Sequence, residues 1–311
     1  ERSRGLGDVY KRQGMQWRGR RRSSNVEDRR GGGGGGGGGL SIGAVIIALI
    51  LWKVFGIDPQ TTLGVASQVQ NTTQTPSTQE TQSQAESRAF VETILADTED
   101  VWGAIFAQAG GTYIPPKLTL FSGQVNSACG FASAASGPFY CPADQKIYLD
   151  TQFFVAMRKQ MGITGELNHS ELTQPSQVAD FAQAYVIAHE VGHHVQTLLG
   201  ISPKVREAQA RASKARANEL SVRQELQADC FAGLWARHNH ERTQFLQAGD
   251  IEEALDAAEK IGDDYLQRQA GGQVVPDSFT HGTSRQRQNW FYQGFDTGDI
   301  NACDTFGVAN I

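Results

Sequence analysis

The chain has 311 residues and a net charge of −5 at pH 7, a length that suits one or two domains. The charge is unevenly distributed, since residues 1–57 carry +7 and residues 58–311 therefore carry −12. Nucleic acids bind basic surfaces, so the acidic larger part argues against a nucleic-acid partner.

The N-terminal residues divide into two segments. Residues 1–14 show no pattern of structure and precede Met15, so we interpret them as a non-native leader. Residues 15–39 are basic and glycine-rich: six arginines stand against Glu27 and Asp28, and nine consecutive glycines end the segment. We expect this segment to lie in the cytosol, because positive charge beside a membrane segment marks the cytosolic side.

Residues 40–57 are apolar except for Ser41 and Lys53. As a helix they would span roughly 27 Å, which is just enough to cross the hydrocarbon core of a bilayer. A secretory signal peptide is the alternative, but no convincing small-x-small cleavage site follows. We therefore predict one transmembrane helix in the bacterial inner membrane, with the residues after it on the periplasmic or extracytoplasmic side.

Residues 58–87 are rich in Gln, Thr and Ser and predict a disordered linker. Residues 88–311 are enough for one globular domain. In chain order we expect helices over residues 88–109, 151–161, 176–199, 202–239, 250–269 and 284–293, and strands over residues 117–121 and 146–150. Helices dominate and the few strands come early, so the predicted fold class is α+β, mostly helical with a small sheet.

Individual residues mark several of these boundaries. Gly200 is placed to end the central helix, Ser202 and Pro203 to start the next one, and Gly294 to end the last. The strand over residues 146–150 is a candidate edge strand that could pair with an extended peptide substrate.

All four cysteines follow the predicted membrane segment: Cys129, Cys141, Cys230 and Cys303. An even number outside the cytosol fits two disulfides. A bond between Cys129 and Cys141 would close a short loop and leave Cys230 for Cys303, although the sequence cannot prove this pairing. A zinc site built from all four is the alternative, but their spacings do not suit one.

Two histidines four residues apart, His189 and His193, lie in the predicted central helix. At this spacing both project from one helix face about one turn apart, so both can reach a single metal ion. Glu190 follows the first histidine and can lie beside the ion without binding it. The pattern is typical of a zinc ion with two nitrogen ligands and an open position for water, with the glutamate as general base.

A hydrolytic zinc needs a third protein ligand, and Glu225 and Asp229 lie four apart on the next helix. The apolar residues that surround them indicate a buried helix, where carboxylates need partners. We expect Glu225 to be the third ligand and Asp229 to accept a hydrogen bond from a ligand histidine. Glu219 and Asp229 are the alternative third ligands.

The oxyanion that forms during hydrolysis needs a further positive or hydrogen-bonding group. His281 and Arg287 are candidates for that role. Tyr185 lies one turn before the first histidine and is either a core residue or one that orients ligands or substrate. Gly192, inside the histidine motif, would let another element approach the metal helix closely.

Several motifs occur in an order that is found in one protein family. They are Met15-Gln-Trp-Arg-Gly-Arg-Arg, Asn25-Val-Glu-Asp-Arg-Arg, Ala128-Cys-Gly, Gly137-Pro-Phe-Tyr-Cys-Pro, Ile147-Tyr-Leu-Asp, His189-Glu-Val-Gly-His-His-Val-Gln, Glu225-Leu-Gln-Ala-Asp-Cys-Phe-Ala-Gly and Thr280-His-Gly-Thr-Ser. From Met15 to about Gly307 the chain thus resembles the bacterial putative neutral zinc metallopeptidases, membrane-anchored proteins of the gluzincin type.

The resemblance implies a zincin-like fold in which His189, His193 and Glu225 bind one Zn²⁺ per chain and Glu190 is the base. The spacing of His281 and Arg287 also resembles a His-x-x-x-x-x-Arg element of some integral-membrane gluzincins.

Together these observations predict a membrane-anchored zinc metalloendopeptidase whose partners are a peptide or protein substrate and the lipid bilayer. The alternative is a catalytically silent envelope binding or scaffold protein that is stabilised by zinc. Glu190 favours the enzyme, because a scaffold would not need a carboxylate at that position.

Overall fold

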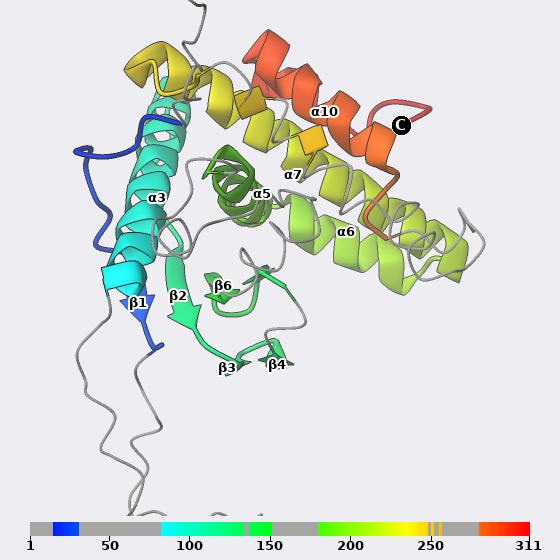
Figure 1. Ribbon diagram of the computed structural model, residues 1–311. Coiled ribbons are helices and arrows are strands. Elements are labelled where there is room, and N and C mark those ends of the chain that lie inside the picture. Colours follow the sequence, from blue (N-terminus) through cyan, green and yellow to red (C-terminus); the bar gives the residue numbers. More distant parts are fainter. Residues whose placement is uncertain are drawn as a thin grey trace, which may run out of the picture. The chain divides into compact units, whose positions relative to one another are not determined.

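The computed structural model describes residues 15–30, 82–133, 137–150, 180–247, 250–251, 255–256 and 280–311. Its helices are α3 (Gln82–Gln108), α5 (Asp180–Leu198), α6 (Ile201–Ala210), α7 (Lys214–Thr243), α10 (Ser284–Thr297) and the short 3₁₀ helix η3 (Ile300–Cys303). Its strands are β1 (Val26–Asp28), β2 (Lys117–Phe121), β3 (Gln124–Ser127), β4 (Gly130–Ser133), β5 (Phe139–Cys141) and β6 (Lys146–Asp150). This part of the chain is mostly helical with a small sheet, as expected for the α+β class (Figure 1).

The main sheet has the strand order β1-β2-β6-β5, in which the first three strands are parallel and β5 is antiparallel to β6. Beyond their first residues, β2 and β6 are buried throughout, as expected for inner strands covered on both faces. The prediction that residues 146–150 form an edge strand is therefore wrong, because the chain just before them folds back as β5 and pairs with them. Among the described strands, β1 and β5 are the edges of this sheet.

Helix α5 lies in the middle of the hydrophobic core. It packs against α3, β5, β6 and α7, and α10 packs along α7 (Figure 1). Every residue from Asp180 to Gly192 is buried, so both faces of this part of the helix contact protein. The helix ends as predicted, with Gly200 in the left-handed conformation two residues after Leu198.

The helical stretch predicted over residues 202–239 is two helices, α6 and α7, in the structure. The prediction was wrong because Ser213 supplies a second helix start, with its side chain accepting a hydrogen bond from the backbone of the first turn of α7. Ser202 is not the cap of α6 either, since Gly200 occupies that position and Ser202 is buried within the helix.

Helix α10 continues past its predicted end at Gly294 and stops before Gly298, which has a positive φ. Gly294 lies instead where α10 crosses α7: a Cβ there would be 1.9 Å from the carbonyl oxygen of Cys230. Glycine is therefore required at position 294 by the close approach of two backbones, not by a helix end.

Helix α3 begins at Gln82, so the end of the predicted linker over residues 58–87 is helical. Four other predictions, for residues 1–14, 40–57 and 151–161 and for most of 250–269, lie outside the described residues. Of the helices that the structure does describe, none combines the length and the apolar character that a membrane crossing requires.

Residues 15–30, which we call the N-terminal strap, belong to the same folded unit as the helices and the sheet. The strap contributes β1, which pairs in parallel with β2 so that Val26 lies opposite Leu118. Met15 and Trp17 are buried in the main hydrophobic core. The prediction of a separate N-terminal segment is therefore wrong for these residues.

Three arginines of the strap, Arg20, Arg21 and Arg22, pair with carboxylates on α3. Arg20 contacts Asp97, and Arg21 lies 2.9 Å from Glu99 and 2.7 Å from Asp100. A bilayer between the strap and the helix would prevent all these pairs and leave the edge of β2 unpaired. The basic pattern that the sequence analysis interpreted as an orientation signal thus also serves to bind an acidic helix.

Both predicted disulfides are confirmed. Cys129 is bonded to Cys141, and Cys230 is bonded to Cys303. The first joins the turn of the β3–β4 hairpin to β5, and the second joins α7 to η3.

Candidate metal centre

Helices α5 and α7 bring three predicted metal ligands together. The Nε2 atom of His189 lies 3.1 Å from one carboxylate oxygen of Glu225, and the Nε2 atom of His193 lies 3.3 Å from the other. One ligand atom from each residue can be chosen so that all lie within 4.8 Å of one another, which suits a single metal ion. Two imidazoles and one carboxylate are a ligand set of catalytic zinc sites.

The other ring nitrogen of each histidine has a partner of its own. His189 Nδ1 lies 2.8 Å from Asp229 Oδ1, and His193 Nδ1 lies 2.9 Å from Gln196 Oε1. Because both partners are oxygen acceptors, each Nδ1 keeps its proton when the ring is neutral, and Nε2 then has the lone pair that a metal requires. The protonation pattern thus fits zinc as well as the ligand types do.

A close helix contact places Glu225 opposite the histidines. A Cβ on Gly192 would lie 3.1 Å from both the Cα and the carbonyl oxygen of Ala228. Any larger side chain at this point would push α7 away from α5, and with it the carboxylate that completes the site. The expectation that Gly192 permits a close approach is confirmed.

Asp229 is fully buried and holds a group of polar side chains behind His189. The hydroxyl of Tyr185 donates to Asp229 Oδ1 at 2.5 Å, and Nη2 of Arg287 donates to the same oxygen at 3.0 Å. A buried carboxylate requires such partners. Tyr185 is thus a buried residue that contacts, through Asp229, the ring of His189.

The pKa values in this metal-free arrangement follow from burial and from the charged neighbours. Burial opposes the charged form of His189, but the Asp229 carboxylate more than offsets this and raises the pKa of His189 to about 10. Burial works to raise the pKa of Glu225, but the adjacent histidines hold it well below its ordinary value. For Asp229 burial is likewise offset, first by Arg287, and its pKa is lowered.

Glu190 is 8% exposed, and burial raises the pKa of its carboxyl group. The two histidines and Arg287 work in the opposite direction, while Glu225 adds to the increase. A raised pKa brings a carboxylate closer to the range in which it can both accept and release a proton near neutral pH.

The two predicted oxyanion candidates lie in different places. Arg287 is 2% exposed, with its Nη1 4.0 Å from Glu225 in addition to its contact with Asp229. It thus lies behind the ligands. His281 is exposed, and its Nδ1 lies 3.0 Å from the hydroxyl of Thr280. None of the contacts described above joins His281 to the metal ligands.

Glu219, an alternative third ligand, has other partners. Its carboxylate lies 2.6 Å from Arg216 and 3.0 Å from Arg223. The other alternative, Asp229, points its Oδ1 at Nδ1 of His189, which is the nitrogen that faces away from Glu225. The geometry therefore favours Glu225.

Gln196, the partner of His193, was not among the residues predicted from the sequence. The two residues are three apart on one helix, a spacing at which side chains meet. That spacing is the only signal in the sequence, and it is weak because glutamine is also common on solvent-facing helix surfaces.

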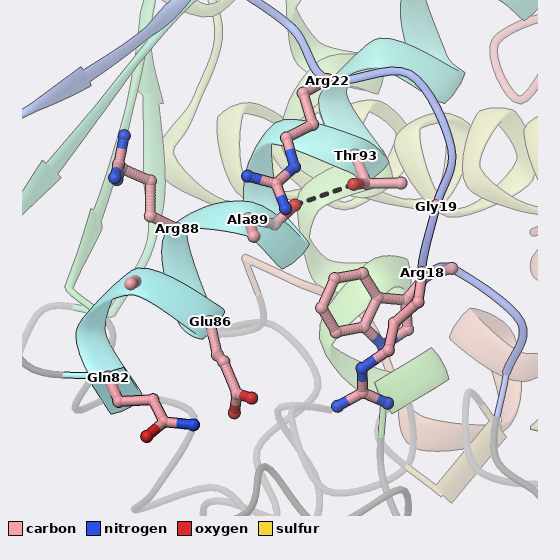
Figure 2. Close-up of a pocket in the computed structure, with 10 residues that line it drawn as sticks. Arg18, Gly19, Arg22, Gln82, Glu86, Arg88, Ala89 and Thr93 are labelled. Carbon is pink, nitrogen blue, oxygen red and sulfur yellow. Dashed lines mark hydrogen bonds between the residues drawn. The ribbon is translucent and has the colours of Figure 1, made fainter.

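A separate pocket of about 370 Å³ lies between the strap and the first turns of α3. Figure 2 shows its lining: Trp17, Arg18, Gly19, Arg22, Gln82, Ala85, Glu86, Arg88, Ala89 and Thr93, with the hydroxyl of Thr93 bonded to the carbonyl of Ala89. None of the candidate site residues lines it, so it is distinct from the metal centre.

Comparisons with known proteins agree with the site. The model of a family described as "Putative neutral zinc metallopeptidase" matches residues 15–306. The Escherichia coli K12 protein named "Uncharacterized protein YpfJ" is 47% identical over 302 residues, which are 94% of this chain and 99% of that protein.

A second group of relatives comes from mycobacteria. "Uncharacterized protein Rv2575" of Mycobacterium tuberculosis H37Rv is 40% identical over 236 residues, or 73% of this chain and 74% of that protein, and "Uncharacterized protein Mb2605" of Mycobacterium bovis matches to the same extent. No solved structure shows a significant match to the chain.

Proposed function

This chain belongs to the putative neutral zinc metallopeptidase family, and from its site we propose that it is a zinc-dependent metalloendopeptidase. The observation that carries the proposal is the convergence of His189 Nε2, His193 Nε2 and the Glu225 carboxylate, with both Nδ1 atoms already bonded to acceptors. His189, His193 and Glu225 would hold one zinc ion.

Zinc held by these residues supplies a Lewis acid that makes a water molecule a strong nucleophile near neutral pH. Glu190 would serve as the general base that takes a proton from the attacking water and passes it to the departing amine, a role that its raised pKa supports. Asp229 keeps His189 in the required tautomer, and Arg287 and Tyr185 hold Asp229 in place.

The peptide substrate is proposed to pair with an edge of the sheet. Among the described strands β5 is the edge next to β6, and β5 also packs against α5. An extended peptide added there would receive backbone hydrogen bonds from a strand that contacts the metal helix. His281 is exposed and remains the proposed group for the oxyanion.

The test is the variant Glu190→Gln in the full chain, compared with wild type for zinc content, melting temperature and cleavage of a peptide library. We expect unchanged zinc content and stability but loss of cleavage by at least about 100-fold, as for removal of a general base. The alternative, a zinc-stabilised scaffold, requires that wild type and variant bind zinc alike and that neither cleaves any peptide.

The compartment of the protein is a separate part of the proposal. Two disulfides favour an oxidising compartment outside the cytosol, and residues 40–57, which are apolar, would attach the protein to the membrane from that side. Because the strap is part of the folded unit, we propose that residues 15–30 lie in the same compartment as α3 to α10. This proposal differs from the cytosolic N-terminus that the sequence predicts.

Single cysteines at two exposed positions test the compartment, because the four native cysteines are all in disulfides. In spheroplasts, an impermeant maleimide should label both Ser24→Cys in the strap and Glu207→Cys in α6. Labelling of Glu207→Cys alone would place the strap across the membrane and contradict its packing against α3.

A further inference from the structure

A series of buried amides leads from His193 to the Cys230–Cys303 disulfide. Nε2 of Gln196 donates to Oε1 of Gln227 at 3.0 Å, and Nε2 of Gln227 donates to the carbonyl oxygen of Cys303 at 3.0 Å. With the bond from His193 to Gln196, three hydrogen bonds join the metal centre to η3. Both glutamines are buried, so these bonds have little competition from water.

The donor and the acceptor of each hydrogen bond in this series follow from the group at its end, the carbonyl of Cys303. The carbonyl oxygen of Cys303 can only accept, so Gln227 must turn its NH₂ group toward it and its oxygen toward Gln196. The NH₂ group of Gln196 also donates to the backbone carbonyl of Gln224 at 2.7 Å. Its oxygen must then face His193, which leaves Nδ1 of His193 as the only possible donor.

The disulfide determines where the series ends. Cys303 lies in η3, and its bond to Cys230 holds η3 against α7, the helix that also carries Gln227 and Glu225. Without that bond, η3 would still pack against α7 and α10, and Thr305 would still exchange hydrogen bonds with Arg223 of α7. No covalent bond would then fix the carbonyl of Cys303 relative to Gln227, the residue whose orientation that carbonyl determines.

We infer that Gln196 and Gln227 are positioning residues that couple the Cys230–Cys303 disulfide to the tautomer and orientation of His193. The inference rests on the proposed metal site and adds to it a role for residues that do not bind the metal. It predicts that zinc affinity depends on a disulfide and on a glutamine that do not touch the metal.

The first experiment measures zinc affinity of the full chain by competition with a chromophoric chelator. Methionine is close to glutamine in shape but cannot continue the series, so we expect Gln196→Met to bind zinc about 10- to 100-fold more weakly and Gln227→Met about tenfold more weakly. Gln209→Met is the matched control, because Gln209 also donates two hydrogen bonds, to Ala217 and Ser221, but lies outside the series.

A purely structural role would lower the melting temperature without changing the metal site. Cobalt(II) in place of zinc separates the two cases, because its visible absorption bands report ligand geometry. We expect altered bands for Gln196→Met and Gln227→Met and wild-type bands for Gln209→Met.

The second experiment is a double-mutant cycle between the disulfide and the series. Removing Cys230 and Cys303 by alanine substitution should weaken zinc binding in the wild-type background but have little further effect in Gln227→Met. The pair Cys129→Ala/Cys141→Ala is the control and should leave zinc affinity unchanged. If removal of Cys230 and Cys303 prevents folding, the zinc affinities of the two glutamine variants decide whether the series acts on the metal site.

Zinc affinity that is unchanged in Gln227→Met, or additive effects in the cycle, would overturn the inference while leaving the proposed function intact. A wild-type protein that binds no zinc would overturn both.

Discussion

His189 and His193 lie one turn apart on one helix and offer the same atom to the same site, yet what lies behind them differs. Behind His189 are charged groups, Asp229 and Arg287. Behind His193 is a neutral amide, Gln196. Both arrangements determine the tautomer, but only the first places a negative charge against the ring.

The difference shows in the proton affinity of the two rings. Asp229 raises the pKa of His189 to about 10, whereas the pKa of His193 is raised mainly by Glu225, on the metal side of the ring. A carboxylate makes a ligand more basic but must itself be compensated in the core. An amide orients its histidine without that requirement. The protein thus orients His189 with a charged carboxylate and His193 with a neutral amide.

The largest effect on stability and zinc binding is expected when the charge of Asp229 is removed. Asp229→Asn keeps the shape and a hydrogen-bond acceptor but leaves buried Arg287 with only the more distant carboxylate of Glu225, 4.0 Å away, as a charged partner. We expect a loss of roughly 3–5 kcal/mol in the free energy of unfolding and zinc binding weakened by about 10- to 100-fold. Denaturant unfolding of chelator-treated protein and zinc titration measure the two effects, and wild-type stability would show that the charge of Asp229 is not needed.

The double variant Asp229→Asn/Arg287→Met tests whether charge is the cause. Removing both charges should restore most of the lost unfolding free energy, because no uncompensated ion stays in the core. Zinc affinity should stay low, because Nδ1 of His189 still lacks a carboxylate as its partner. A double variant less stable than Asp229→Asn would mean that Arg287 stabilises the fold independently of Asp229.

A carboxylate in place of the Gln196 amide would give both histidines a charged partner at Nδ1. In Gln196→Glu the new carboxylate would face the carbonyl of Gln224 and Oε1 of Gln227, to which the amide now donates. We expect a loss of about 1–3 kcal/mol in unfolding free energy and a higher pKa of His193 in the metal-free protein, measured by NMR titration. An unchanged pKa would indicate that the carboxylate turns away from the ring.

The smallest effect concerns pH. The pKa of His189 is raised from 6.5 to about 10 on folding, so its contribution to stability is complete below about pH 6.5 and is lost as the pH rises toward 10. Glu225 and Asp229 have lowered pKa values, so their contributions are complete above about pH 4.5 and are lost in more acidic solution.

Metal-free protein should therefore have its highest melting temperature between about pH 4.5 and 6.5, as determined by calorimetry in the presence of a chelator. In Asp229→Asn the decline above pH 6.5 should be weaker. An equal decline in both proteins would assign it to other groups.

The ligands could be predicted from the sequence because their arrangement follows from local geometry. Residues four apart on a helix share a face, and an acidic pair within an apolar helix needs partners, which identified Glu225. The position of Arg287 could not be derived in this way, because it depends on the crossing of α10 and α7. The role of Gln196 depends on the side chain beyond it, and no local pattern reveals that partner.

The packing of the strap, in contrast, could not be predicted from its sequence. Its arginines are compatible with two interpretations, a membrane orientation signal and a binding segment for an acidic helix, and the tertiary contacts show that several of them pair with α3. The same holds for the strand over residues 146–150, because its two neighbours, the antiparallel β5 and the parallel β2, are set by tertiary pairing that no local pattern reveals.

The strap also has a consequence for handling the protein. A fragment that starts at residue 88, where the globular domain was expected to begin, would lack β1 and the first turn of α3. The backbone groups of β2 that pair with β1 would then be open, and a bare strand edge invites strand pairing between copies. Asp97 would also lose the guanidinium of Arg20. Such a fragment should aggregate during purification.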